Sequence, residues 1–326
     1  MKKTTVKSHP NIALIKYWGK KDPELNIPSN PSLSFTLSKA HTILSVEKNS
    51  TSTEDIFHLN NDKIDLSKNK KLSKQIRLLK NYYQIDIPLF FESSNNFPMS
   101  AGIASSASAF SALTCAFHAF KNGSQTLQND LENADKAKEI SRLSRLGSGS
   151  ACRSIYPAWS YWEEEYAIPL HPLEHWPMHD SIVLFSEKPK AVSSSQGHLS
   201  AQTSPLFQQR MQTLPNRILQ LKQSILDKNT LSFFQIIEEE ALEMIEIMKT
   251  SKDKICYLNQ HSLKFIENML KIPYKNREFA FTFDAGANAH VISPNNTLDQ
   301  LKFYLKKWNL PEKIWSDCMG QAPQVI

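Results

Sequence analysis

Small and hydroxyl-bearing residues are concentrated between Pro98 and Ser106, where the sequence reads PMSAGIASS. They lead into about 18 uncharged, helix-compatible positions, 101–118. A helix N-terminus presents unpaired backbone N–H groups and the positive end of the helix dipole, so it can bind an anion without a lysine. Gly102 would let a ligand approach the backbone closely. The segment predicts a phosphate-binding loop at a helix start, although small residues packing a helix against a sheet are an alternative. The Walker pattern of P-loop NTPases is absent.

A second candidate anion site lies at Gly147–Ser150, after a helical pattern that ends near Leu146. The Gly-Ser-Gly-Ser sequence predicts a turn with two hydroxyls and exposed N–H groups. Arg153 adds a planar fork that matches a carboxylate or a phosphate. A helix C-cap would explain Gly147, but it would explain neither the serines nor Arg153.

Two further segments carry charged groups at the ends of apolar strands. The run 11–21 brings Tyr17 and Lys20 close to one strand end, where they could orient an anionic substrate, although a lysine that simply reaches solvent is the alternative. Asp284 lies in a turn, TFDAGAN, between two apolar runs. Such a carboxylate could accept a proton from a hydroxyl in a cleft, or it could be an ordinary turn residue.

The elements expected to position these groups are mixed α and β in both halves, with a domain boundary near residue 179 after three prolines. Strands and helices do not alternate regularly enough for a doubly wound sheet. Expected strands are 11–15, 33–37, 42–47, a hairpin of 55–59 and 63–66, an aromatic pair within 154–166, 181–185, 279–283 and 288–292; expected helices are 101–120, 131–146, 205–226, 230–250, 257–271 and 297–308.

Composition restricts the function class. The chain has 326 residues, 40% hydrophobic and 21% charged, with a formal charge of +6. Lysines and arginines are scattered rather than arranged in a basic stripe, so an anionic small molecule is favoured over nucleic acid. The four cysteines are widely spaced, which favours reduced thiols in a cytoplasmic protein. The segment 101–120 is long enough to span a membrane but weakly apolar, so no membrane association is expected.

Taken in order, these segments resemble the diphosphomevalonate decarboxylases of the GHMP kinase superfamily. The resemblance runs from Asn11 to about residue 292 and rests on the motifs NIALIKYWGK, NNFPxxAGxASSA, GSGSACRS, VSSSQGH and TFDAG. It implies an α+β, GHMP kinase-like two-domain fold. The implied N-terminal domain, residues 1–178, is ribosomal protein S5 domain 2-like and binds ATP; the implied C-terminal domain, residues 179–326, is a ferredoxin-like α/β sandwich.

The resemblance also implies an activity: ATP-dependent decarboxylation of 5-diphosphomevalonate to isopentenyl diphosphate, with Mg²⁺ assisting and with release of ADP, phosphate and CO₂. Asp284 matches the carboxylate that takes the proton of the tertiary hydroxyl, Arg153 the guanidinium that orients the substrate carboxylate, and Lys20 the lysine near the transferring phosphoryl group. A homodimer is typical of the family. A decarboxylase of 5-phosphomevalonate, a kinase that does not decarboxylate and a silent anion-binding protein are alternatives.

The remaining implied site residues fall into three groups. The substrate-binding group is Tyr17, Lys20, Ser148, Ser150, Arg153 and Ser194. The nucleotide-binding group is Asn96, Ser100, Ala101, Gly102, Ala104, Ser105 and Ser106, of which Ser106 is also the expected Mg²⁺ contact. The chain departs from the family pattern at Ala287, where proline is usual, and at Ser195, where some bacterial members carry arginine. These departures leave the phosphorylation state of the substrate open.

Overall fold

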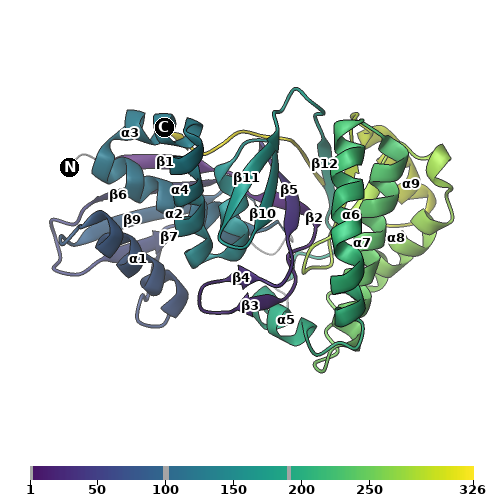
Figure 1. Ribbon diagram of the computed structural model, residues 1–326, viewed down its shortest axis with the longest axis horizontal. Helices are drawn as coiled ribbons and strands as arrows, with labels where there is room; N and C mark the ends of the chain where they lie inside the picture. Colours follow the sequence, from purple (N-terminus) through teal and green to yellow (C-terminus); the bar gives the residue numbers. More distant parts are fainter. Residues whose placement is uncertain (1–2, 98–102, 189–191) are drawn as a thin grey trace.

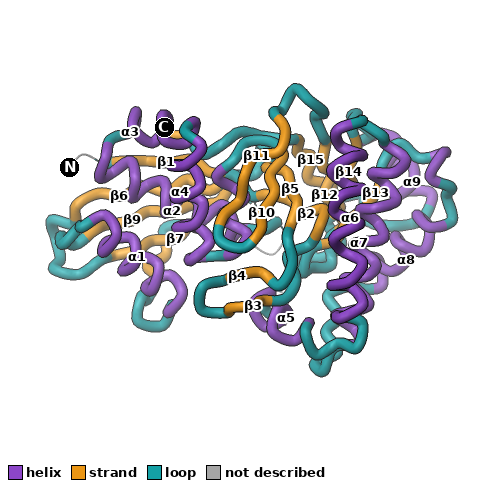
Figure 2. Tube along the Cα trace, viewed as in Figure 1, coloured by secondary structure: helices purple, strands orange, loops and turns teal. Residues whose placement is uncertain are grey.

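A sheet at one end of the molecule, a second sheet in the middle and a helix-covered sheet at the other end make up the structure (Figures 1 and 2). The computed structural model describes residues 3–97, 103–188 and 192–326. The mixed α+β character expected from the sequence is confirmed. Among the described residues, no helix combines the length and apolar character needed to cross a membrane.

The first sheet has six strands in the order β16-β1-β6-β9-β7-β8. Their bounds are Gln324–Val325 (β16), Thr4–Ser8 (β1), Thr42–Lys48 (β6), Leu89–Asn95 (β9), Ile56–Leu59 (β7) and Asp62–Ile64 (β8). Asn60 and Asn61 have φ of 52° and 71°, as a two-residue hairpin turn requires, so the predicted hairpin is confirmed. Helix α2 (Ser105–Asn122) packs on β1 and β6.

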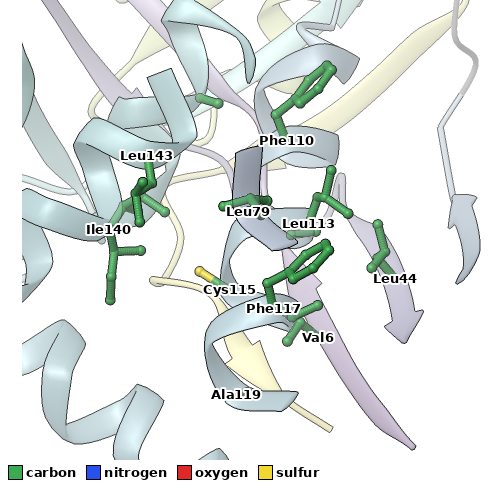
Figure 3. Close-up of a cluster of buried hydrophobic side chains, with 14 of the residues drawn as sticks. Val6, Leu44, Leu79, Phe110, Leu113, Cys115, Phe117, Ala119, Ile140 and Leu143 are labelled. Atoms are coloured by element: carbon green, nitrogen blue, oxygen red, sulfur yellow. The ribbon is translucent and has the colours of Figure 1, made fainter. Parts of the chain in front are cut away.

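Helix α2 is the centre of the N-terminal core because 13 of its 18 residues are buried. Helices α1 (Lys70–Tyr83), α3 (Ser124–Glu132) and α4 (Ala134–Gly147) pack around it. Figure 3 shows Leu113 and Phe117 from α2 close to Val6 and Leu44 of the sheet. Burial on most sides explains why residues 107–118 carry no charge.

The middle sheet has the order β11-β10-β5-β2, with bounds Tyr166–His171, Trp159–Glu163, Ser32–Thr36 and Asn11–Ile15. Every residue of β2 and β5 is buried. We call the part that contains the first and middle sheets the first lobe, and the helix-covered sheet at the other end with its helices the second lobe. Apolar side chains of the middle sheet belong to one core cluster with side chains of helices α6 (Phe207–Leu226) and α7 (Thr230–Thr250) of the second lobe. The two lobes are therefore joined by a continuous apolar core rather than by a solvated linker.

The last sheet is antiparallel, in the order β13-β14-β12-β15, with bounds Ala280–Phe283, Ala289–Ser293, His179–Val183 and Ile314–Cys318. Side chains of helices α8 (Gln260–Leu270) and α9 (Leu298–Lys307) belong to the same apolar core cluster as side chains of this sheet. Short elements complete the site region: the ribbon of β3 (Lys20–Asp22) and β4 (Ile27–Pro28), the 3₁₀ helix η1 (Gly149–Ile155) and helix α5 (Ser194–Ala201).

Several elements differ from the sequence expectation. The helix expected at 131–146 is α4, which begins three residues later because Asn133 has an extended backbone and its side chain caps the helix; α3, which precedes it, was not expected. The 3₁₀ helix η1 replaces the start of the aromatic strand pair expected within 154–166. Strands β1, β9, β15 and β16 and helix α5 were not expected. β16 returns to pair with β1, so the chain ends on the N-terminal lobe; the division at residue 179 stays a prediction.

Candidate active site

A cavity of about 850 Å³ opens between the lobes, bounded by the end of β2, the start of α2 and η1 on one side and by α5 and the turn after β13 on the other. It gathers most of the site residues expected from the sequence: Tyr17, Lys20, Ala104, Ser105, Ser106, Ser148, Ser150, Arg153, Ser194 and Asp284. Two groups of expected nucleotide contacts are not among them. Asn96 does not line the cavity; its side chain bonds the backbone of Lys39 and His41. Ser100, Ala101 and Gly102 lie outside the described residues.

Asp284 directly follows β13 and is held by a lysine from the other lobe. The Lys16 Nζ donates to Asp284 Oδ1 at 2.7 Å. The Lys16 side chain is 3% exposed and that of Asp284 is 20% exposed, so the pair is shielded from water on the lysine side and open to the cavity on the carboxylate side. This is the geometry expected of a carboxylate that must reach a ligand.

Positive charges around Asp284 control its ionisation. Burial alone would raise the pKa of Asp284, but Lys16, His290 and Arg153 outweigh burial and lower the pKa below its ordinary value. Asp284 is therefore ionised at neutral pH.

His290 lies on β14 with its Nδ1 2.7 Å from Asp180 Oδ2, and both side chains are buried. Burial would lower the pKa of His290, but the contact with Asp180 raises it.

Arg153 lines the cavity from η1 and is almost fully buried. Its Nε donates to Asn11 Oδ1 and Ser34 Oγ, both at 3.1 Å, which fixes the plane of the group. The Trp162 ring supports it at 5.5 Å. The described residues offer Arg153 Nη1 no hydrogen-bond partner, although this nitrogen is buried. A ligand carboxylate in the cavity would satisfy it.

Tyr17 lines the cavity and packs against two other rings. Its ring contacts the ring of His198 at 4.1 Å and the edge of Trp162 at 4.6 Å between centroids. Gly149 is required there, because a Cβ at this position would lie 2.7 Å from the Tyr17 ring. The two serine-rich motifs meet beside it, where Ser148 Oγ donates to Ser106 Oγ at 3.2 Å.

The other end of the cavity is suited to phosphates. Helix α2 begins at Ser105, and its N-cap, Ala104, makes no side-chain hydrogen bond to the first turn. Lys20 donates from Nζ to Asn26 Oδ1 at 2.7 Å, and Lys71 and Lys188 also line the cavity. Within the described residues, no group of three His, Cys, Asp or Glu side chains is placed to hold a metal ion. Mg²⁺ bound through phosphates keeps several waters, so this donor set still fits a nucleotide-bound Mg²⁺.

The sequence analysis missed Lys16. It placed the lysine of the site at Lys20, whereas the residue in contact with Asp284 is Lys16. One signal could have found it: Lys16 directly follows four apolar residues, 12–15, and precedes a Tyr-Trp pair. A lysine at such a position is almost never buried unless it is paired.

Comparisons with known proteins identify the family of the chain. Residues 8–168 match the family model described as diphosphomevalonate decarboxylase-like N-terminal domain, and residues 181–325 match the one described as mevalonate 5-diphosphate decarboxylase C-terminal domain. The diphosphomevalonate decarboxylase of Candida albicans is 32% identical over 94% of this chain and 88% of its own length.

Solved structures extend the likeness to the whole fold. The crystal structure of mevalonate diphosphate decarboxylase from Staphylococcus aureus has a TM-score of 0.88 and 33% identity, covering 100% of this chain and 98% of its own. A second structure, named MDDEF in complex with MVAPP, AMPPCP and magnesium, has a TM-score of 0.86 and 30% identity, covering 99% and 98%. The chain therefore belongs to the diphosphomevalonate decarboxylase family.

Proposed function

We propose that this chain uses ATP to decarboxylate 5-diphosphomevalonate, producing isopentenyl diphosphate, ADP, phosphate and CO₂. One observation carries the proposal: an ionised carboxylate, Asp284, lines the same cavity as Arg153, whose Nη1 has no hydrogen-bond partner among the described residues. That cavity also includes the start of α2, where phosphates are stabilised. The reaction needs all three features.

The first step transfers a phosphoryl group to the tertiary hydroxyl of the substrate. Asp284 accepts the hydroxyl proton as the oxygen attacks the γ-phosphorus of ATP, and ADP leaves with the electrons of the broken P–O bond. Lys16 holds the carboxylate in place and neutralises its charge before the substrate binds. Such preorganised charges need no rearrangement as the reaction proceeds.

The second step breaks the bond between the tertiary carbon and the phosphorylated oxygen. Phosphate departs with that electron pair, the C–C bond to the carboxylate supplies the electrons of the new alkene, and CO₂ is released. Arg153 keeps the carboxylate aligned with the breaking bond through Nη1, for which the described part of the chain provides no acceptor. Tyr17, Ser148, Ser150 and Ser194 complete the substrate-binding set and limit access of water.

The nucleotide phosphates are proposed to bind at the start of α2, with Ser105 and Ser106 and with Lys20 nearby. Mg²⁺, when bound, offsets the phosphate charge, and Ser106 is the proposed protein contact. Replacing Ser106 with leucine should raise the KM for ATP more than the KM for 5-diphosphomevalonate. Equal increases in both would contradict this assignment.

We also propose a cytoplasmic homodimer with domains 1–178 and 179–326. Free thiols at Cys115, Cys152, Cys256 and Cys318 support a reducing compartment, and the dimer rests on the family resemblance. Sedimentation velocity tests the oligomeric state, and a monomer at micromolar concentration would contradict it.

The direct test of the activity measures ADP and CO₂ from purified protein supplied with ATP and 5-diphosphomevalonate. Equal molar amounts are expected, together with isopentenyl diphosphate. ADP without CO₂ would identify a kinase instead. A parallel reaction with 5-phosphomevalonate tests the substrate, since a higher kcat/KM for the monophosphate would overturn the proposed specificity.

A further inference from the structure

A cluster of charged side chains contacts the backbone of Lys16. These side chains belong to two neighbouring helices of the second lobe. Arg210 and Arg217 belong to α6, and Glu240 and Glu243 belong to α7. The side chains of Arg210 and Glu240 are both 0% exposed. Burying charges costs free energy even when they are paired, and apolar residues often stabilise such positions equally well. A role beyond stability would explain why charges occupy this position.

The cluster bonds both backbone groups of Lys16. Glu240 Oε1 accepts the Lys16 backbone N–H at 2.9 Å, and Arg210 Nη2 donates to the Lys16 carbonyl oxygen at 3.3 Å. Asn30 Nδ2 donates to the same carbonyl oxygen at 2.9 Å. Strand pairing does not fix the backbone of Lys16, because Lys16 lies beyond the end of β2 and the register of β2 against β5 is already irregular between residues 13 and 15.

Contacts on both sides of Lys16 thus reach the second lobe. Its backbone is bonded to α6 and α7, and its ammonium group is bonded to Asp284 after β13. Helix α7 packs directly on β13. We propose that the buried Arg210–Glu240 pair is a positioning unit, which fixes the Lys16 backbone so that its ammonium group meets Asp284 across the boundary between the lobes. The inference rests on the proposed function of Asp284 as the base.

The same helix provides a matched control. Glu238 on α7 is also 0% exposed, pairs with the buried Arg277 at 2.7 Å and accepts the backbone N–H of Phe281 at 3.2 Å. Like Glu240, it accepts hydrogen bonds from a buried arginine and from a backbone N–H. It differs in two respects: it does not touch Lys16, and burial raises its pKa to about 7, whereas the neighbouring arginines outweigh burial and lower the pKa of Glu240.

The experiment compares Glu240→Gln with Glu238→Gln in the full chain, measuring unfolding temperature, kcat and both KM values. Both variants should lose stability. Only Glu240→Gln should lose kcat, by tenfold or more, with the KM for ATP unchanged. In a Lys16→Met background, Glu240→Gln should cause no further loss of kcat, because a residue that acts through Lys16 has nothing left to position.

Equal kcat in the Glu240→Gln and Glu238→Gln variants, or losses that multiply in the Lys16→Met background, would overturn the inference. If Glu240→Gln does not fold, the paired change Arg210→Met with Glu240→Leu removes the charges from both partners and should restore folding. A low kcat in this folded variant is expected, and a normal kcat would refute the positioning role. Wild-type protein that releases no CO₂ would instead refute the proposed function.

Discussion

Replacing Lys16 with methionine tests the electrostatic basis of the site. Methionine fills much of the space of the lysine stem but leaves Asp284 without the cation 2.7 Å away. At an effective dielectric constant of about 20, two unit charges at this distance attract by about 6 kcal/mol, which is an upper bound because both groups also lose hydration. Breaking a buried pair costs about 3–5 kcal/mol in measured cases. The lower value applies here, because the Asp284 side chain is 20% exposed.

We expect a loss of transition-state stabilisation of similar size, about 3 kcal/mol, which corresponds to a decrease in kcat/KM of about 100-fold. The pH profile should change in a specific direction as well. Lys16 lowers the pKa of Asp284, so its removal raises that pKa, and the acid limb of kcat/KM moves to higher pH. Steady-state rates of CO₂ release between pH 4 and pH 9 would show both effects.

Lys20→Met is the matched control for this experiment. Lys20 lines the same cavity, but its ammonium group bonds Asn26 and not the carboxylate. This variant should lose activity without moving the acid limb. If the acid limb stays in place in Lys16→Met, or moves equally in both variants, the electrostatic account of Asp284 is refuted.

Three further substitutions test separate parts of the site. Asp284→Asn should lower kcat by about 10²–10⁴-fold and should also lower the melting temperature, because it leaves the buried ammonium group of Lys16 without a counter-charge; retention of full CO₂ release would exclude Asp284 as the base. Gly149→Ala should destabilise the protein by about 1–3 kcal/mol and lower kcat/KM, because the new Cβ would lie 2.7 Å from the Tyr17 ring; wild-type denaturation and kinetics would contradict this packing. Since the contact with Asp180 raises the pKa of His290 above 6.5, its contribution to stability is complete below pH 6.5 and is lost as the pH rises through the folded-state pKa. Urea titrations of wild type and His290→Gln should therefore converge towards alkaline pH, and a constant difference in unfolding free energy would refute the assignment.

Local patterns predicted the parts of the fold that local forces determine. The helix expected at 230–250 has those bounds, and the hairpin at Asn60 and Asn61 forms where the turn residues indicated it. Strands β1 and β16 were missed because a strand of two to five residues with a polar, exposed side carries little periodicity. Their pairing joins the two ends of the chain, which no local signal can report.

The candidate site follows the same division. Motifs pointed to Asp284 and Arg153 because each lies in an unusual local sequence: Arg153 follows a glycine- and serine-rich turn, and Asp284 begins a DAG turn between apolar runs. Lys16 was missed because its environment is created by long-range contacts: its partners are residues 240 and 284, more than 200 positions away. The charge of Lys16 was visible in the sequence, but its burial was not.

The division of charges between the lobes has a physical consequence for the fold as well as for the reaction. The first lobe contributes Lys16 and Arg153 to the cavity, and the second contributes Asp284. Without the second lobe, Lys16 and Arg153 would be two like charges close together. Without the first lobe, Asp284 would be an unpaired carboxylate partly removed from water, and both situations are unfavourable. Bringing the lobes together pairs these charges, so the apolar core between β2 and α7 and the charges of the cavity favour the same arrangement. A change that loosens that core should therefore reduce catalysis through Lys16 even when it lies far from the cavity.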